Sequence, residues 1–311
     1  MPEFALNLIE TPFDLSYTLE SGQVFRWQKR EEWWYGVVGL GAVKVKQEQN
    51  SLVFASSTVD IDPTYVRDYF GLNDDLSHIL SSVTRDRILA EAIQRFYGLR
   101  LIHQPIWECL VSFTISTNMN IPRIAKTIAS LCERFGEPFE FEGRRYNLFP
   151  RPEALAEAEA EQLSACGLGY RTRFVKWVAQ AVYEEWVDLS ELRVQGYEKA
   201  RELLMGRILN KKSFLGIGPK VADCVLLFSC GKYEAFPIDV WISKALAYYY
   251  PGIIEPRLIE RLEMRAKRRS SLSLRDYDLL SAAARAHFGR YAGYAQQYLY
   301  LLSRTKGSFS T

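Results

Sequence analysis

The chain has few of the residues that mark a metal centre or a disulfide-bonded secreted protein. Its 311 residues include five cysteines, and none of them forms a C-x-x-C pair. They are Cys109, Cys132, Cys166, Cys224 and Cys230. An odd number of scattered cysteines predicts neither a zinc site nor a complete set of disulfides. We therefore expect free thiols, and no bound metal ion or other cofactor.

Long apolar runs and a strong net charge are also missing. No stretch approaches the roughly 18 uncharged apolar residues of a membrane span. The start, Met-Pro-Glu-Phe-Ala-Leu-Asn, lacks the basic and apolar regions of a signal peptide. With 39 basic against 37 acidic residues, the net charge of +2 gives only faint support for a polyanionic partner. We expect an intracellular protein without a membrane anchor.

What is present is enough apolar material for a large core, since 48% of the residues are hydrophobic. Short aromatic and β-branched runs at 24–28, 33–38, 42–47 and 51–55 alternate with polar or glycine breaks, which is typical of an antiparallel meander. Beyond Pro63 the apolar spacing becomes helical and stays so nearly to the end. The sequence therefore predicts an α+β fold, with a small antiparallel β-sheet domain over residues 1–85 and a mainly α-helical body over 86–311.

Apolar residues at helical spacing indicate where the helices of this body lie. The predicted helices are 87–96, 107–116, 122–135, 152–165, 170–186, 197–208, 220–228, 240–250 and 293–304. Residues 258–269 are crowded with basic side chains, which favours a solvated helix face over a dedicated binding surface.

The segment 214–224, Phe-Leu-Gly-Ile-Gly-Pro-Lys-Val-Ala-Asp-Cys, separates two predicted helices. Gly216 and Gly218 permit a tight turn with positive φ and let the backbone approach an outside group. Free N–H groups at the start of the next helix favour an anion such as a phosphodiester. A helix C-cap and turn in any αα-hairpin would use the same residues, so this segment alone leaves both functions open.

Lys220 opens the helix after this turn, and Asp239 lies just before a later apolar-periodic helix, where it is predicted to be the N-cap. Backbone N–H groups would fix such a carboxylate and keep it ionised. Beside it, an unprotonated lysine can attack a sugar carbon and form a Schiff base while the carboxylate stabilises positive charge. The simpler alternatives are a plain helix cap and a lysine that contacts phosphate or solvent.

Together with three further segments, this arrangement resembles the helix-hairpin-helix DNA glycosylase superfamily, and within it the 8-oxoguanine DNA glycosylase/lyase branch. In that superfamily a Leu-x-Gly-Ile-Gly hairpin precedes a helix and then an aspartate, and in lyase members a lysine opens the helix. The further segments are 21–27 (Ser-Gly-Gln-Val-Phe-Arg-Trp), 115–124 (Ile-Ser-Thr-Asn-Met-Asn-Ile-Pro-Arg-Ile) and 167–173 (Gly-Leu-Gly-Tyr-Arg-Thr-Arg). The resemblance covers most of the chain and places the helix-hairpin-helix at about 197–230.

The resemblance implies DNA base-excision repair. The enzyme would act as a monomer on double-stranded DNA containing 8-oxoguanine opposite cytosine, and would flip the damaged nucleotide out of the stack. Lys220 would attack C1′ and form a Schiff base, with Asp239 as its carboxylate partner, and β-elimination would cut the strand at the abasic site. Such a protein would be DNA-associated, in the cytoplasm of a prokaryote or the nucleus of a eukaryote.

By the same resemblance four residues form the base pocket. The Gly22 carbonyl would accept the N7–H that 8-oxoguanine has and guanine lacks, and an unpaired acceptor facing guanine would cost about 1–3 kcal/mol. Gln296 would read the Watson–Crick edge, and Cys224 and Tyr300 would sandwich the ring. Without the resemblance, Gly22 fits a simple turn, and the two sandwich residues fit ordinary core filling.

Four other residues match family positions on the opposite strand. Asn118, Arg123 and Arg171 would read the orphan cytosine, whose N3 and O2 suit guanidinium donors. Tyr170 matches the wedge that buckles the stack. Phosphate contacts or surface pairing are the simpler roles for these polar residues.

Three residues depart from the family pattern. Met119 replaces the middle residue of an Asn triplet, Trp241 replaces a histidine two residues after the aspartate, and Tyr300 replaces a phenylalanine. The indole N–H of Trp241 could still donate to DNA phosphate, and Tyr300 keeps the ring, whereas Met119 puts polar contacts near the vacated base in doubt. The four spaced cysteines of the iron–sulfur cluster in endonuclease III relatives are absent.

Three other functions stay open at this point. The same lysine and aspartate could act on another damaged purine, such as a formamidopyrimidine. A non-catalytic protein could use the hairpin for phosphates alone, but it would need neither Lys220 nor Asp239. A monofunctional glycosylase that activates water would need no lysine nucleophile.

Overall fold

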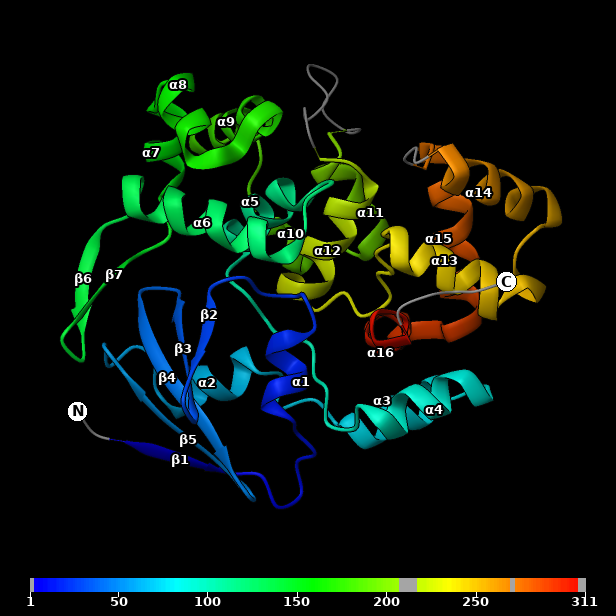
Figure 1. The fold of residues 1–311 in the computed structure, drawn as a ribbon, viewed down its shortest axis with the longest axis horizontal. Coiled ribbons are helices and arrows are strands. Elements are labelled where there is room, and N and C mark those ends of the chain that lie inside the picture. Colours follow the sequence, from blue (N-terminus) through cyan, green and yellow to red (C-terminus); the bar gives the residue numbers. More distant parts are fainter. Residues whose placement is uncertain (1–2, 207–216, 269–271, 307–311) are drawn as a thin grey trace.

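The structure, a computed structural model, describes residues 3–206, 217–268 and 272–306. An antiparallel sheet of five strands forms one end of the molecule and helices form most of the rest (Figure 1). The strand order is β1-β5-β4-β3-β2, with β1 (Phe4–Asn7), β2 (Trp27–Arg30), β3 (Trp33–Val38), β4 (Gly41–Glu48) and β5 (Ser51–Ser56). The predicted α+β fold, an N-terminal antiparallel sheet followed by a mainly helical body, is confirmed.

Strands β3, β4 and β5 lie within one residue of their predicted ends. The predicted strand at 24–28 instead begins at Trp27, because the chain before it forms a loop fixed by the buried side chain of Gln23. The Gln23 amide donates to the Arg100 carbonyl at 2.8 Å and accepts the Ile102 N–H at 2.8 Å. Strand β1 was not predicted, because it has only four residues and its partner β5 is distant in sequence.

One face of the sheet packs against α1 (Leu15–Glu20) and α2 (Pro63–Tyr69). Val45, Leu52 and Phe54 are fully buried there. Trp27 pairs with Gly36 across β2 and β3, and a Cβ on Gly36 would come within 2.5 Å of the indole. Gly36 is therefore what lets Trp27 lie flat on the sheet.

Helix α5 (Ile106–Ser116) contributes to the cores of two helical lobes, which lie on either side of it in Figure 1. Val111 and Ile115 pack with α6 (Ile121–Phe135) and α9 (Thr172–Tyr183) in the first lobe. Leu110 and Phe113 pack in the second lobe with α12 (Pro219–Cys230) and α16 (Ala292–Lys306). Because α5 belongs to both cores, its C-terminal end lies at the junction of the lobes.

The other helices complete these two lobes. They are α3 (Leu76–Val83), α4 (Arg87–Arg95), α7 (Pro152–Glu157), α8 (Ala160–Leu163), α10 (Glu191–Val194), α11 (Tyr197–Leu204), α13 (Val240–Tyr249), α14 (Pro256–Arg268), α15 (Leu274–Phe288), a π-helical turn (Ser164–Leu168) and 3-10 turns (Gly169–Arg171, Pro251–Ile253, Gly289–Tyr291). Among the described residues, no helix is long and apolar enough to cross a membrane.

Two predicted helices need correction. The predicted helix 152–165 is interrupted, because Ala158 has extended backbone angles (φ −57°, ψ 139°) and Glu159 then caps α8. The predicted helix 170–186 begins only at Thr172 and ends at Tyr183. The last residues of the predicted helix 197–208 lie outside the described residues.

A two-stranded hairpin, β6 (Pro138–Phe141) and β7 (Arg144–Asn147), was not predicted within the helical body. Phe141 is buried against Val37 and Ala42 of the N-terminal sheet. The hairpin therefore links the first lobe to the sheet.

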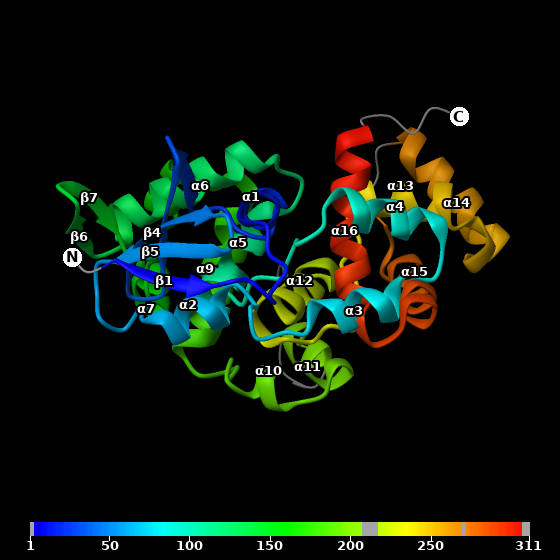
Figure 2. The same cartoon turned by 90° about the horizontal axis from the view of Figure 1, so that it is seen from below.

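Helices α3 and α4 pack beside α16 (Figure 2), so a segment on the N-terminal side of residue 85 shares the core of the second lobe. Nearby, the Asp74 carboxylate accepts hydrogen bonds from the hydroxyls of Tyr233 at 2.7 Å and Tyr294 at 2.8 Å. The division of the chain at residue 85 stays a prediction, and the two parts are in close contact.

The basic segment 258–269 falls mostly in α14. The Nε atoms of Arg261 and Arg265 lie 2.9 and 3.3 Å from the carboxylate of Asp276 in α15. Part of the positive charge of the segment is therefore balanced within the protein.

Candidate active site

Lys220 lies in the first turn of α12, which begins at Pro219 after the N-cap Gly218. Its amine donates a hydrogen bond to Oγ of Ser116 at 2.9 Å and lies 5.0 Å from the centroid of the Phe113 ring. Ser116 is buried at the end of α5, where its hydroxyl also donates to the Phe113 carbonyl at 2.7 Å. The Lys220 amine is thus placed at the junction of the two lobes.

Asp239 is the N-cap of α13, as predicted, and its Oδ1 accepts the backbone N–H of Ile242 at 2.8 Å. Burial raises the pKa of this carboxyl above its usual value, although the N–H groups of Ile242 and Trp241 and the positive charge of Lys220 act in the opposite direction. The expected hydrogen bonds are therefore present, but burial outweighs them. The structure brings Lys220 and Asp239 close enough to interact electrostatically.

Gly22, in the loop after α1, lies next to Tyr300 of α16. Gly22 has a positive φ of 79°, and a Cβ placed on it would lie 3.1 Å from the Tyr300 hydroxyl. The loop is attached to α16 by the side chain of Gln297, whose amide donates to the Ser21 carbonyl at 2.7 Å. Gln296, the preceding residue, is buried, and its Oε1 has no hydrogen-bond partner among the described residues. An acceptor in this state is available to a ligand.

Cys224 follows Lys220 by one helical turn and is 3% exposed. Burial raises the pKa of its thiol to about 12, with smaller influences from Lys220, which lowers it, and Asp239, which raises it. Burial also raises the pKa of Tyr300 to about 12, with Asp239 raising it and Arg304 lowering it. Both side chains are therefore neutral at physiological pH, and both lie near the Lys220–Asp239 pair.

Asn118, Tyr170 and Arg171 meet at a second place on the surface. Asn118 is exposed and has a positive φ of 53°. The Arg171 guanidinium lies 4.4 Å from the Tyr170 ring centroid and donates to the carbonyls of Thr117 at 2.9 Å and Asn118 at 3.1 Å. Tyr170 remains 52% exposed. Arg171 is buried and already bonded to the backbone, so reading a base would require it to exchange these hydrogen bonds.

Arg123 is exposed in the first turn of α6. The same helix is capped by Asn120, whose side chain accepts the Arg123 N–H at 3.0 Å. Met119 is partly buried against the core of the first lobe, with Sδ 4.0 Å from the Thr127 hydroxyl. Met119 thus adds apolar contact to the lobe at a position where the family has an asparagine.

The turn before α12 is only partly described. Gly216 lies outside the described residues, whereas Gly218 has φ −84° and open space where a Cβ would be. The positive φ predicted for this glycine pair is therefore not found at Gly218. Trp241 is partly exposed in the first turn of α13, close behind Asp239.

Comparison with known proteins identifies the family. Residues 5–110 match the family of the 8-oxoguanine DNA glycosylase N-terminal domain, and residues 111–266 match the HhH-GPD superfamily of base excision DNA repair proteins. The chain belongs to this DNA glycosylase superfamily, with the N-terminal domain of the 8-oxoguanine branch.

Relatives of this glycosylase cover nearly its whole length. The structure of MBOgg1 in complex with a low-affinity DNA ligand is 32% identical with a TM-score of 0.82, over 99% of this chain and 100% of that one. The Clostridium acetobutylicum 8-oxoguanine glycosylase/lyase, in complex with double-stranded DNA containing cytosine opposite 8-oxoguanine, is 29% identical with a TM-score of 0.82, over 95% and 93%. A probable N-glycosylase/DNA lyase from Methanothermobacter thermautotrophicus is 27% identical over 95% of each chain.

Sequence reasoning missed two residues of this site in the glycosylase. Ser116, which accepts the hydrogen bond of Lys220, lies inside the segment 115–124 but was given no role. Arg304 lies one helical turn after Tyr300, and its guanidinium is 5.6 Å from the Tyr300 ring centroid. The helical spacing from Tyr300 could have found Arg304, whereas the Ser116 contact depends on how α5 meets α12.

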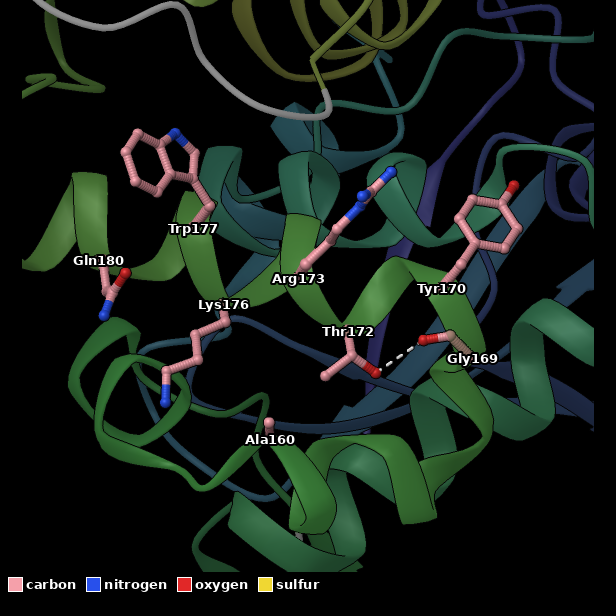
Figure 3. A pocket seen from close by; sticks show the side chains of 8 residues that line it. All are labelled: Ala160, Gly169, Tyr170, Thr172, Arg173, Lys176, Trp177 and Gln180. Carbon is pink, nitrogen blue, oxygen red and sulfur yellow. Dashed lines mark hydrogen bonds between the residues drawn. The ribbon is translucent and has the colours of Figure 1, made fainter.

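A shallow pocket of about 570 Å³ lies away from this site, beside Tyr170 (Figure 3). It is lined by Ala160, Gly169, Tyr170, Thr172, Arg173, Lys176, Trp177 and Gln180. The Lys176 amine donates a hydrogen bond to the Ala158 carbonyl at 2.7 Å, so its charged group is bound to the backbone of the same lobe. Neither Lys220 nor Asp239 lines this pocket, so it is separate from the candidate active site.

Proposed function

We propose that this protein excises 8-oxoguanine from opposite cytosine in DNA, with Lys220 as nucleophile and Asp239 as its carboxylate partner. It is a bifunctional DNA glycosylase and AP lyase that acts on 8-oxoguanine in base excision repair. The observation that carries the residue assignment is the convergence of Lys220, Asp239 and Cys224, whose charges and burial act on one another at the junction of the lobes.

The chemistry of the proposal follows from the pair. After losing a proton to solvent, the neutral Lys220 amine attacks C1′ and forms a C–N bond as the glycosidic bond breaks. The base leaves with the electron pair of that bond and takes up a proton released from the Lys220 nitrogen. Opening of the sugar ring gives a Schiff base, and loss of a C2′ proton then expels the 3′ phosphate. The Asp239 carboxylate, fixed by its N-cap hydrogen bond, stabilises positive charge at the sugar during the first step.

The base pocket is formed by residues from both ends of the chain. The Gly22 carbonyl would accept N7–H of 8-oxoguanine, and an unmatched acceptor facing guanine costs about 1–3 kcal/mol. The free Oε1 of Gln296 supports its role at the Watson–Crick edge. Cys224 and Tyr300 are neutral and would stack on the two faces of the ring.

On the opposite strand, Asn118, Arg123 and Arg171 would contact the orphan cytosine and Tyr170 would fill the gap in the stack. The exposure of Tyr170 and Asn118 on neighbouring segments supports this arrangement. Contacts to the DNA backbone would come from the hairpin with Gly216 and Gly218 and from the indole of Trp241.

The remaining parts of the proposal concern the setting. The protein would act as a monomer on double-stranded DNA, inside the cell, in the cytoplasm of a prokaryote or the nucleus of a eukaryote. Size-exclusion chromatography with light scattering, with and without a DNA duplex, tests the monomer; a stable dimer on DNA would contradict it.

The test of the function is single-turnover cleavage of duplexes with 8-oxoguanine opposite C, A, G or T, with borohydride in parallel samples. Cleavage that is fastest opposite cytosine, together with a trapped covalent complex, is the expected result. A trapped complex with equal cleavage opposite all four bases would support the lysine mechanism and reject the preference for cytosine. Binding with neither cleavage nor trapping would favour a non-catalytic protein, and activity only on formamidopyrimidine would change the substrate.

A further inference from the structure

A buried carboxylate that the proposed mechanism does not use lies on the same helix as Lys220. Asp223 of α12 is 0% exposed, and its two oxygens accept three hydrogen bonds. Oδ1 accepts the Tyr197 hydroxyl at 2.8 Å and Arg201 Nε at 3.0 Å, and Oδ2 accepts the Tyr277 hydroxyl at 2.7 Å. Asp223 therefore connects α12 to α11 and to α15.

One of these donors, Tyr277, also contacts the segment that carries Asp239. The Tyr277 oxygen, while donating to Asp223, accepts the backbone N–H of Ile238 at 3.1 Å. Ile238 directly precedes Asp239 and is buried in the irregular connection between α12 and α13. Hydrogen bonds that run in one direction, from N–H to hydroxyl to carboxylate, strengthen one another. The backbone N–H of the residue before Asp239 is thus bonded to a network that includes a carboxylate on the helix of Lys220.

We propose that Tyr277 is a positioning residue for Asp239, in that its hydroxyl, oriented by buried Asp223, fixes the Ile238 peptide and thereby the direction of the Asp239 carboxylate relative to Lys220. This inference rests on the proposed function of Asp239. Without the hydroxyl, the Ile238 N–H would be a buried donor without a partner, which favours movement of this connection. A carboxylate displaced by a fraction of an ångström stabilises developing charge less well.

The chain offers a matched control, because Tyr197 makes the same kind of bond to the same carboxylate. Tyr197 and Tyr277 are 4% and 3% exposed, and each donates one hydroxyl to Asp223. Only Tyr277 also accepts a backbone N–H from the segment that carries Asp239. Both Tyr197→Phe and Tyr277→Phe should lower thermal stability, Tyr277→Phe by more because it also leaves the Ile238 N–H unpaired, and only Tyr277→Phe should slow excision.

The experiment compares both variants in single-turnover excision of 8-oxoguanine, over a range of enzyme concentrations. For Tyr277→Phe we expect the saturating rate to fall by about tenfold, which corresponds to about 1.4 kcal/mol of activation free energy. The enzyme concentration that gives half of this rate should stay within about twofold of wild type, since DNA contacts are unchanged. Tyr197→Phe should keep the wild-type rate.

A double variant tests whether the effect passes through Asp239. If it does, the double variant Tyr277→Phe/Asp239→Asn is slowed relative to wild type by less than the product of the slowing factors of the two single variants. Effects that multiply, equal slowing by Tyr197→Phe, or a wild-type rate in Tyr277→Phe would each overturn the inference. Should Tyr277→Phe not fold, Asp223→Asn takes its place, because it keeps the side-chain shape and replaces one of the two oxygens that accept from Tyr197, Arg201 and Tyr277 by an NH2 donor. A wild-type saturating rate in Asp223→Asn would then overturn the inference.

The wild-type protein in the same assay separates this inference from the function on which it rests. A wild type without excision overturns the proposed function and the inference with it. An active wild type together with an unimpaired Tyr277→Phe overturns the inference alone.

Discussion

Replacing Gly22 by alanine perturbs the proposed base pocket in a way that the structure makes calculable. A side chain at φ 79° is strained by about 1–2 kcal/mol. The new Cβ would also lie 3.1 Å from the Tyr300 hydroxyl and 3.3 Å from Ile121 Cδ1, so that Tyr300 or the loop must move. Movement of the loop displaces the Gly22 carbonyl from the proposed position of base N7, and movement of Tyr300 displaces the ring that would stack on the base.

The expected cost has two parts. Losing the N7–H hydrogen bond and part of the stacking on Tyr300 costs about 2 kcal/mol, or about 30-fold in the single-turnover rate. Gly143→Ala is the matched control, because Gly143 also has a positive φ, 68°, but no atom lies within 4 Å of the position of its Cβ. It carries the backbone strain without the contact to Tyr300.

The assay is single-turnover excision of 8-oxoguanine, with melting temperatures measured for both variants. We expect both variants to melt below wild type and only Gly22→Ala to lose activity. A wild-type excision rate in Gly22→Ala would show that the Gly22 carbonyl does not read the base. Equal losses of activity in the two variants would point to stability as the cause.

Three further predictions concern the catalytic pair. Lys220→Gln should abolish excision and borohydride trapping while DNA binding, measured by fluorescence anisotropy, stays within about threefold of wild type; residual excision at the full rate would remove Lys220 from the mechanism. Burial raises the pKa of Asp239, and the ionised carboxylate is the active form, so the excision rate should fall as the pH is lowered through that raised pKa. Asp239→Asn should be slow and should not show this fall at low pH. A pH–rate profile in the variant that matches wild type would reduce Asp239 to a helix cap. Ser116→Ala removes the acceptor of the Lys220 amine and should slow excision by about two- to tenfold, whereas Ser303→Ala, which removes a hydroxyl bonded only to the Leu299 carbonyl of its own helix, should not; equal rates in the two serine variants would contradict the positioning of Lys220 by Ser116.

Local patterns were sufficient for much of the fold. Strands β3 to β5 each span at least six residues between polar or glycine breaks and were predicted within one residue. Asp239 was recognised as an N-cap because capping depends on the immediately following residues. The four-residue strand β1 and the β6–β7 hairpin were missed, since both exist through pairing or packing with distant segments. The break at Ala158 was missed for lack of a glycine or proline within 153–165.

The site shows the same division. Gly22, Cys224 and Tyr300 were assigned by resemblance, and the structure brings them together near Lys220 and Asp239.

Three residues that contact this site or its neighbouring segment were not predicted. Ser116 and Tyr277 make contacts with segments that are far apart from them in sequence, so no local spacing marks them. Arg304 contacts Tyr300 of its own helix and could have been found from helical spacing. Arg171 was expected to face a base, but in the structure its guanidinium donates to the backbone carbonyl of Thr117.

The measurement that tests the central claim most directly is the identification of the residue trapped by borohydride. The protein is incubated with a duplex carrying 8-oxoguanine, reduced, digested with protease and nuclease, and its peptides are sequenced by mass spectrometry. The account predicts a sugar remnant on Lys220. An adduct on another amine, or excision without any adduct, would contradict it.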